Sequence, residues 1–440
     1  MSNQLPGAAA ALRETALNGL RQGDVAAAEQ GFARLLELVP DDVEALQFIA
    51  SRHLVRGDAL HAIALLLMAE QAQPENAGTL HQLGVAQIAA GHREAALRSL
   101  RRAVELGPSI FTARLRLGMA LEEAGETHQA LVAYFGAVNT AQAQGRWLSD
   151  ATTTPGLRDA VRHAISFIDA GRRQLFDQVL APLRQRYGRT ELSRVEDSLS
   201  IYLGEQAAAI PDARQKPKFL YFPGVPSQPY YPRERFPWQA ELEANSAAIR
   251  EELLGVLGDG RVLESFLQTD SSQDTADLLR SSGSAAAAWD AYFFHRHGEH
   301  YAEHAERCPK TAGLLDNLPL AYVREHSPET LYSVLRPGTH ILPHRGVTNT
   351  RLVTHLPLIV PADCALRVGG ETHAWQEGRC VTFDDTFEHE AWNNSAETRV
   401  VLIIDSWNPD LSEIERLAIA DLVAAIGDFN RASEVHTPRG

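Results

Sequence analysis

The 440-residue sequence has few cysteines, no long hydrophobic run and no excess of basic residues. Its three cysteines, Cys308, Cys364 and Cys380, lie far apart, which argues against a disulfide framework and against the paired spacing of a zinc site. No run reaches the roughly 18 apolar residues that a membrane span needs, and the N-terminus carries no basic stretch followed by an apolar core. We therefore expect a protein of the reducing cytoplasm with no membrane partner.

Basic residues are outnumbered by acidic ones, 41 to 56, and the formal net charge is -15. Nucleic-acid binding depends on Lys and Arg residues that neutralise phosphates, so we expect no nucleic-acid partner. Hydrophobic residues make up 45% of the chain, and its length suits about two or three domains with at least one substantial core.

The first part of the chain repeats with a period of 34 residues. Four kinds of residue keep this step: Gly23, Gly57, Gly91 and Gly125; Ala28, Ala62, Ala96 and Ala130; Pro40, Pro74 and Pro108; and the small residues Ala16, Ala50, Gly84 and Gly118. Tetratricopeptide repeats have this period. Each unit predicts a helix, a turn at the Gly, a second helix near the Ala, and a Pro that ends it. We expect an all-α solenoid of about four stacked units over residues 1–145.

Helical patterning continues without the period over residues 146–215, which we interpret as a cap and connector. Proline and aromatic residues then become dense, so a second domain is predicted over 216–440. A helix is expected over Gln239–Leu257, and further helix or loop to Leu320. The predicted strands are Thr330–Leu335, Arg351–Val360, Ala365–Val368, Arg379–Phe383, Glu390–Asn393 and Arg399–Ser406. Short strands separated by Gly, Pro and Asn fit a β-barrel or jelly roll.

Two histidines in this domain, His344 and His389, stand in segments that resemble the two metal-ligand strands of a double-stranded β-helix oxygenase. The usual mononuclear iron site holds the metal with two His and one carboxylate. Here Gly346 stands two residues after His344, where the carboxylate is expected, and glycine has no ligand. Iron at this place would have two protein ligands and a water. A histidine isolated on a strand is more often structural.

The region from Tyr332 to Pro409 closely resembles the aspartyl/asparaginyl β-hydroxylase family, whose members have a two-His iron centre. The matching stretches are Tyr332–Thr339, Pro343–Gly346, Thr348–Leu352, His355–Leu358, Phe383–Asp385, Phe387–Glu390 and Arg399–Ile403. A weaker likeness runs from Lys218–Gly224 to Trp238. The resemblance covers roughly the C-terminal half. It implies a multidomain protein in which a double-stranded β-helix domain, jelly-roll or cupin-like, follows the repeat solenoid.

The resemblance also implies a cofactor and a set of site residues. Fe(II) would bind His344 and His389, with 2-oxoglutarate and O2 as cosubstrates. Arg399 would grip the distal carboxylate of 2-oxoglutarate, helped by the Ser333 hydroxyl, and His355 would lie near its iron-chelating end. Arg399 opens an apolar strand, where an unpaired inward guanidinium is costly and needs an anion. The alternative for Arg399 is an ordinary surface arginine at a strand end. The alternative for His355 is a core histidine with its hydrogen bonds satisfied.

Two further positions bear on the substrate. Arg351 matches a family arginine close to the substrate, although a strand residue facing water would explain it almost as well. Val353 stands where the family often has a second arginine that helps to hold carboxylates. Either another residue, such as Arg345 or Arg336, substitutes for it, or the substrate is not acidic.

Two clusters have competing interpretations. The His-rich stretch from Phe294 to His304, with Cys308 beyond, suggests a second metal site because His300 and His304 would share a helical face. Its spacing matches no zinc pattern, so a solvated loop is favoured. Asp384 and Asp385 would either supply the missing acid through a water or form a turn and a hydrogen bond near the ligand.

The function predicted from the sequence is an Fe(II)- and 2-oxoglutarate-dependent dioxygenase that hydroxylates the β-carbon of an Asp or Asn residue in a peptide or protein. The repeats would bind the substrate or another partner. One alternative is a hydroxylase of a free amino acid or small metabolite. Another is a non-catalytic repeat scaffold with a degenerate barrel, which Val353 slightly favours and the retained His344, His389 and Arg399 oppose.

Overall fold

The computed structural model describes residues 5–259, 263–267, 278–281 and 286–434. The chain divides into two compact units, the first made of Met1–Gln174 and Phe429–Val435, the second of Leu175–Asp428 and His436–Gly440. The division falls inside two helices, α9 (Arg158–Tyr187) and α16 (Glu413–Ala432). In the described residues, no helix combines the length and the apolar character that crossing a membrane requires.

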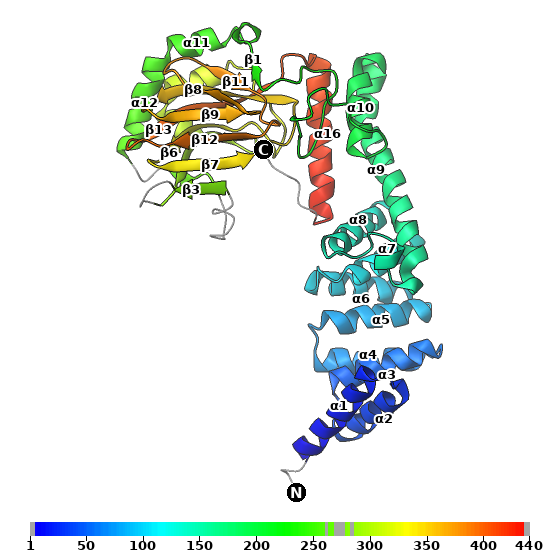
Figure 1. The fold of residues 1–440 in the computed structure, drawn as a ribbon. Coiled ribbons are helices and arrows are strands. Elements are labelled where there is room, and N and C mark those ends of the chain that lie inside the picture. The colour runs from blue at the N-terminus through cyan, green and yellow to red at the C-terminus, as the bar shows by residue number, and fades with distance from the viewer. Residues whose placement is uncertain (1–4, 260–262, 268–277, 282–285, 435–440) are drawn as a thin grey trace. The chain divides into compact units, whose positions relative to one another are not determined.

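Paired helices build the first unit, as the 34-residue period predicted (Figure 1). The pairs are α1 (Leu5–Arg21) with α2 (Val25–Leu38), α3 (Val43–Val55) with α4 (Ala59–Ala72), α5 (Ala77–Ala89) with α6 (Arg93–Leu106), and α7 (Phe111–Glu123) with α8 (Thr127–Ala143). The glycine between the helices of each pair is in the left-handed region, at φ +76°, +80°, +79° and +78° for Gly23, Gly57, Gly91 and Gly125. The second helix of the first three pairs ends two residues before the predicted proline.

Small residues let the two helices of a pair approach, as predicted. A Cβ atom added to Gly118 of α7 would lie 2.5 Å from the Tyr134 ring of α8, and one added to Gly84 of α5 would lie 2.5 Å from Leu100 of α6. Any larger side chain at these positions would separate the helices. The period therefore records a packing constraint inside each repeat.

The end of α16 also belongs to the first unit. The Phe429 ring lies 4.9 Å from the Phe135 ring of α8. Arg114 of α7 is buried and donates a hydrogen bond to the Ser433 carbonyl at 3.4 Å and another to the Glu434 carboxylate. Removing the repeats would therefore expose buried residues near the C-terminus.

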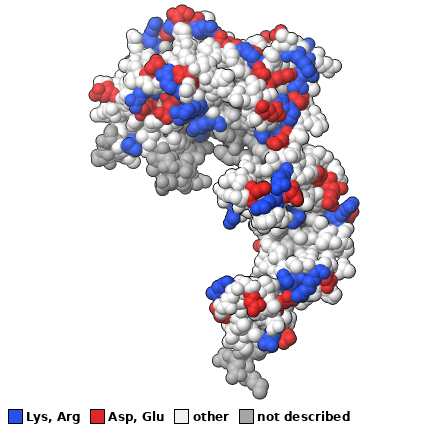
Figure 2. All heavy atoms as spheres, turned by 45° about the vertical axis from the view of Figure 1, so that its right-hand side comes forward, with Lys and Arg blue, Asp and Glu red and all other residues white. Residues whose placement is uncertain are grey.

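Basic and acidic side chains are interspersed over the face of the molecule that Figure 2 shows. Short clusters of both signs alternate along the helices of the first unit and over the second unit. That face therefore carries no continuous band of one charge.

The second unit is built on two antiparallel sheets (Figure 1). The larger has the order β1 (Tyr230–Tyr231), β11 (Val381–Phe383), β8 (Arg351–Ile359), β13 (Arg399–Trp407), β6 (Thr330–Leu335), β4 (Trp289–Arg296) and β2 (Glu264–Ser265), and β5 (Glu299–His300) also pairs with β4. The smaller has the order β10 (Glu371–His373), β9 (Cys364–Val368), β12 (His389–Asn393), β7 (Thr339–His344) and β3 (Leu279–Ser281).

Alternation along the strands separates two cores. On β13, Leu402 packs with the helices that cover the larger sheet, and Val401 packs in the core between the two sheets. The covering helices are α11 (Gln239–Ala244), α12 (Ser246–Gly258), α14 (Ala302–Arg307) and α15 (Pro309–Leu315). Consequently every second residue of β6, β8 and β13 faces the space between the sheets, where polar side chains can meet.

The six predicted strands are present, with ends that differ by at most two residues from β6, β8, β9, β11, β12 and β13. Two predictions were wrong in detail. The helix expected over Gln239–Leu257 is broken at Asn245 into α11 and α12. The stretch before Leu320, predicted as helix or loop, contains strand β4, which lies between β6 and β2 and whose near-continuous buried run hides the alternation that marks a strand.

Gly91→Ala tests the left-handed turn of the repeats. A Cβ atom at Gly91 would meet nothing within 4 Å, so the change adds backbone strain without a clash. We expect the free energy of unfolding to fall by about 1–2 kcal/mol, measured by urea titration followed by far-UV circular dichroism. Gly91→Asn is the control and should lose less, because Asn tolerates the left-handed region. Equal losses for Ala and Asn would contradict this account.

Candidate active site

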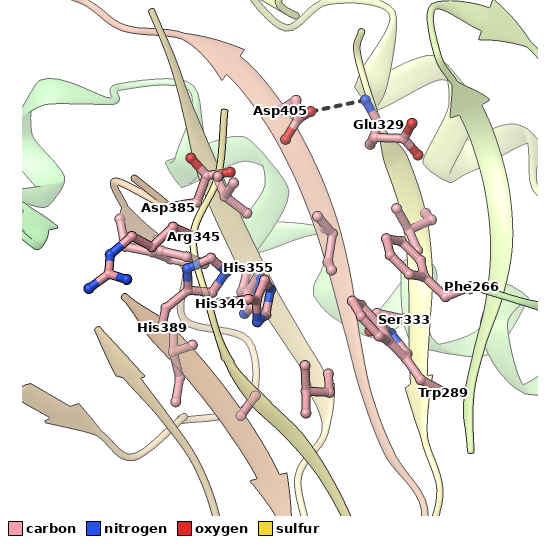
Figure 3. A pocket seen from close by; sticks show the side chains of 18 of the residues that line it. Phe266, Trp289, Glu329, Ser333, His344, Arg345, His355, Asp385, His389 and Asp405 are labelled. Atoms are coloured by element: carbon pink, nitrogen blue, oxygen red, sulfur yellow. Dashed lines mark hydrogen bonds between the residues drawn. The ribbon is translucent and has the colours of Figure 1, made fainter. Parts of the chain in front are cut away.

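A cavity of about 310 Å³ lies between the two sheets of the second unit (Figure 3). All six site residues predicted from the sequence line it: Ser333, His344, Arg351, His355, His389 and Arg399. They come from β6, β7, β8, β12 and β13. Figure 3 shows the three histidines gathered at one side, with Ser333 and Trp289 across the cavity. The structure thus brings together residues up to 66 positions apart in the chain, counted from Ser333 to Arg399.

His344 and His389 form a pair through strand pairing. His344 ends β7, His389 begins β12, and the two stand directly opposite each other in the antiparallel register. Their ring centroids are 4.0 Å apart. Nδ1 of His344 lies 2.8 Å from the Leu342 carbonyl, and Nδ1 of His389 lies 3.1 Å from the Phe387 carbonyl. Because a carbonyl only accepts, each Nδ1 carries the proton and each Nε2 is left unprotonated, which is the form of the nitrogen that can bind a metal ion.

Both imidazoles are neutral at pH 7. Burial lowers the pKa of His344 to about 3, with a further contribution from His389, and burial lowers the pKa of His389 to about 4. Neutral imidazole is the form that binds a metal ion. The pair therefore has the tautomer and the charge state of a ligand pair.

The space beside Gly346 is filled by Asp385. A Cβ atom at Gly346 would overlap the Asp385 carboxylate, and the Gly346 amide donates to the Asp385 carbonyl at 2.6 Å. Burial raises the pKa of Asp385, and its Oδ1 has no hydrogen-bond partner among the described residues. The Asp385 carboxylate, a hydrogen-bond acceptor, thus occupies the space that a side chain at position 346 would need. Asp384 forms a turn, which was the alternative interpretation of these two aspartates: its Oδ1 accepts a hydrogen bond from the Thr386 amide at 2.9 Å.

Arg399 is a buried cation that no described carboxylate neutralises. It is 1% exposed, and its Nη1 donates to the carbonyl and to the hydroxyl of Ser333, both at 3.3 Å. Its guanidinium lies 4.9 Å from the centre of the Trp375 ring, and its Nε has no partner among the described residues. Burial lowers the pKa of Arg399 to about 10, which leaves it charged at pH 7. A buried charge of this kind needs an anion.

His355 lies on β8 between the histidine pair and Arg399. Its ring centroid is 5.0 Å from that of Phe383 and 5.8 Å from that of Trp375. Burial and the neighbouring Arg399 lower the pKa of His355 well below its usual value, and its Nδ1 has no hydrogen-bond partner in the described part of the chain. The interpretation of His355 as a core histidine with satisfied hydrogen bonds is therefore wrong for this nitrogen.

Arg351 is buried, so the interpretation that it faces water is wrong. It is 5% exposed, and its two terminal nitrogens lie 3.0 Å from Asp405 and 3.3 Å from Asp385. Burial opposes its charge, but the nearby carboxylates outweigh burial and raise the pKa of Arg351. Burial raises the pKa of Asp405 to about 7 against the opposing effect of Arg351. Val353 stands across from Asp405 in the register and adds no charge.

The two arginines considered as substitutes for a charge at Val353 each form an ion pair with a carboxylate. Arg345 lines the cavity but pairs with Glu388 at 3.0 Å and points away from the histidines in Figure 3. Arg336 donates to Asp290 at 2.7 Å and does not line the cavity. Lys218, which the sequence analysis did not single out, lines the cavity and has no ion pair with a described residue. The signal for Lys218 in the sequence was its position at the start of Lys218–Gly224, the upstream segment that weakly resembles the family.

The His-rich stretch is not a solvated loop. His295 lies on β4, is 3% exposed, and its Nδ1 is 2.8 Å from the Thr330 hydroxyl. His300 lies on β5 and His304 on α14, so the two share no helical face. In the described part of this stretch, no three His, Cys, Asp or Glu residues are grouped as metal ligands.

Comparisons with known proteins identify the family of the chain. The sequence profile of the aspartyl/asparaginyl beta-hydroxylase family matches residues 243–409. The mouse aspartyl/asparaginyl beta-hydroxylase is 29% identical over 75% of this chain and 44% of its own length. The rat aspartate beta-hydroxylase domain-containing protein 2 is 32% identical over 55% of this chain and 68% of its own. An ornithine lipid ester-linked acyl 2-hydroxylase of Rhizobium tropici is 35% identical over 43% of this chain and 64% of its own.

The chain spans about half the length of the frog aspartate beta-hydroxylase domain-containing protein 2 (55%) and of the mouse and human aspartyl/asparaginyl beta-hydroxylases (44% and 42%). The matched region contains the strands that carry the histidine pair, Ser333, His355 and Arg399. The chain therefore belongs to the aspartyl/asparaginyl beta-hydroxylase family.

Proposed function

We propose that this protein is an Fe(II)- and 2-oxoglutarate-dependent hydroxylase with a double-stranded β-helix catalytic domain, acting on the β-carbon of an Asp or Asn residue in a peptide or protein. One observation carries the proposal. A pair of neutral histidines, each with Nδ1 directed at a backbone carbonyl, shares one cavity with a buried arginine that no described carboxylate neutralises. The first suits a metal ion and the second an organic anion.

His344 and His389 would hold the iron through their Nε2 atoms, and the donor set fits it. Imidazole suits Fe(II), and two ligands leave several coordination positions open. The free Oδ1 of Asp385 leaves a hydrogen-bond acceptor beside them. When bound, Fe(II) with 2-oxoglutarate and O2 supplies the oxidation of an unactivated C–H bond and yields succinate and carbon dioxide.

Arg399 would bind the carboxylate of 2-oxoglutarate that is remote from the metal. A planar guanidinium can grip a carboxylate with two parallel hydrogen bonds, and burial strengthens them. The Ser333 hydroxyl accepts from Trp289 Nε1 at 2.9 Å, which orients it toward Arg399. His355 would lie nearer the metal-binding end, where its free Nδ1 offers a further polar contact.

The apolar walls of the cavity exclude water from the reacting atoms. Ile403 and Leu331 stand opposite each other in the register of the larger sheet, between the row of Arg399 and the row of Asp405. Phe383 and Ile341 line other parts of the same cavity. A dry cavity strengthens the contacts made by Arg399 and limits side reactions.

A second candidate is hydroxylation of a small or apolar substrate, such as a free amino acid, another metabolite or an acyl chain. The charges of the cavity near Asp405 favour this second candidate. Val353 provides no positive charge for a substrate carboxylate, and the Arg351 guanidinium is already paired with Asp405 and Asp385. Among the arginines and lysines that line the cavity, Lys218 alone remains for a substrate carboxylate once Arg399 holds the cosubstrate. The Rhizobium relative, by its name, hydroxylates an acyl chain.

The repeats would bind the substrate or another protein. Repeats of this kind form extended concave surfaces that suit a peptide segment. Because Phe429, Asn430 and Ser433 belong to the first unit and are buried, this role is better tested in the full chain than by deletion. A non-catalytic scaffold would not need Arg399 buried without a counter-ion, so that alternative is disfavoured.

Succinate formation is the first test of the proposal. The purified chain is incubated with Fe(II), 2-oxoglutarate and O2, with and without peptide libraries centred on Asn or Asp. His389→Ala serves as the blank. Succinate above the blank, with a peptide product 16 Da heavier, is expected. Absence of succinate under every condition would contradict the hydroxylase and favour the scaffold.

Removing either histidine should abolish iron binding. His344→Ala and His389→Ala each leave one protein ligand, and a single imidazole does not retain Fe(II) against solvent. Calorimetric titration of Fe(II) under anaerobic conditions measures this, with His373→Ala as the control because His373 does not line the cavity. Tight binding by both ligand variants would refute the pair.

Arg399→Ala should weaken 2-oxoglutarate while iron binding persists. Loss of a charge-assisted contact worth about 1.5–3 kcal/mol raises KM for 2-oxoglutarate about 10- to 100-fold. Initial rates of succinate formation across 2-oxoglutarate concentrations measure the change. Arg336→Ala, a surface arginine outside the cavity, is the matched control. An unchanged KM in Arg399→Ala would remove its assigned role.

Val353→Arg tests the charge of the substrate group. The new guanidinium would stand across from Asp405 in the cavity and add the missing cation. We expect the ratio of Asp-peptide to Asn-peptide turnover to rise about tenfold, because one charge-assisted hydrogen bond contributes about 1.5 kcal/mol. Val353→Met adds bulk without charge and should leave the ratio unchanged. If Arg and Met change it equally, the charge at position 353 does not set substrate choice.

A further inference from the structure

Three potential metal ligands converge at the turn between α3 and α4 in the first unit. His53 lies near the end of α3, Asp58 caps the N-terminus of α4, and His61 lies in its first turn. Gly57, at φ +80°, reverses the chain between them. One ligand atom from each of the three residues lies within 4.8 Å of the others, and no other such group occurs among the described residues. The cluster shares no residue with the cavity of the second unit.

Both rings point the same nitrogen at one carboxylate oxygen. Nδ1 of His53 lies 3.1 Å from Oδ2 of Asp58, and Nδ1 of His61 lies 2.7 Å from the same atom. The ring centroids are 5.5 Å apart, with an angle of 24° between the planes. The side chains of His53, Asp58 and His61 are 30%, 38% and 73% exposed, so an ion can reach them from solvent.

The repeat explains the aspartate but not the histidines. Asp58 accepts from the His61 amide at 3.3 Å, which is an ordinary N-cap, and Asp24 caps α2 in the same way one period earlier. At the position of His53 the other units have Gly19, Gln87 and Leu121, and at the position of His61 they have Ala27, Ala95 and Gln129. A turn of this kind therefore forms without either imidazole. The two rings around the carboxylate are peculiar to the second repeat.

We propose that His53, Asp58 and His61 bind a divalent transition-metal ion of the Zn²⁺ and Ni²⁺ class. Imidazole with carboxylate suits these ions and does not suit Mg²⁺ or Ca²⁺. Zn²⁺ bound by three protein ligands keeps an open position for water or another ligand. Binding moves the proton of each ring from Nδ1 to Nε2, and the ion replaces the two N–H donors at Asp58. It joins the end of α3 to the start of α4 and stabilises the second repeat.

Zinc titration of the full chain tests the site. The protein carries no polyhistidine tag, is stripped with a chelator, and bears His344→Ala and His389→Ala, which remove the proposed iron ligands. Isothermal calorimetry with ZnCl2 should show one saturable site per chain. Adding His61→Ala should weaken it at least about tenfold. His92→Ala, an exposed histidine at the N-cap of α6, is the matched control and should change nothing.

Asp58→Asn separates the ligand role from the capping role. Asn caps a helix about as well as Asp, so the thermal midpoint without zinc should stay the same. The rise in midpoint that zinc produces in the parent should disappear in Asp58→Asn and in His61→Ala. The proposal is overturned if the parent shows no saturable zinc binding, or if His61→Ala binds zinc as the parent does.

Discussion

The antiparallel pairing of β7 with β12 is the constraint on which the proposed active site depends. It sets His344 directly opposite His389 and fixes their separation through backbone hydrogen bonds rather than through flexible side chains. Each ring is then oriented by a carbonyl two residues earlier on its own segment. A shift of one residue in this register would turn one imidazole to the other face of the sheet. The geometry of the proposed metal ligands is thus a property of the sheet.

Two buried arginines show how the cavity separates its roles. Arg351 is neutralised by Asp405 and Asp385 and holds together strands β8 and β13 and the turn before β12. Arg399 has no carboxylate partner among the residues that the structure describes, and it lies over the Trp375 ring in contact with Ser333. Two guanidiniums in one cavity therefore differ in their neighbours. The first is neutralised by carboxylates, and the second is the proposed binding group for an anion.

The repeat unit was predictable because its constraints are local. Left-handed glycines, helix-ending prolines and close helix contacts recur at a fixed step, and each acts within a few residues of the chain. The strands were predictable where apolar and β-branched residues lie between turn residues. Strand β4 is not predictable in this way because a strand buried on both faces lacks alternation, and the His-rich pattern at its end predicts a solvated loop although His295 is 3% exposed.

The sequence by itself determined the repeat period, six strands of the second unit and the identity of six cavity residues, because these follow from residue spacing and from motif resemblance. Only the tertiary structure decided which charges are free. Asp385 at the place of a Gly346 side chain, the pairing of Arg351 and the exposed Lys218 at the cavity depend on contacts between segments distant in the chain. The cluster of His53, Asp58 and His61 likewise becomes visible when the α3–α4 turn brings the rings together. Spacing along a chain cannot report such distances, because folding sets them.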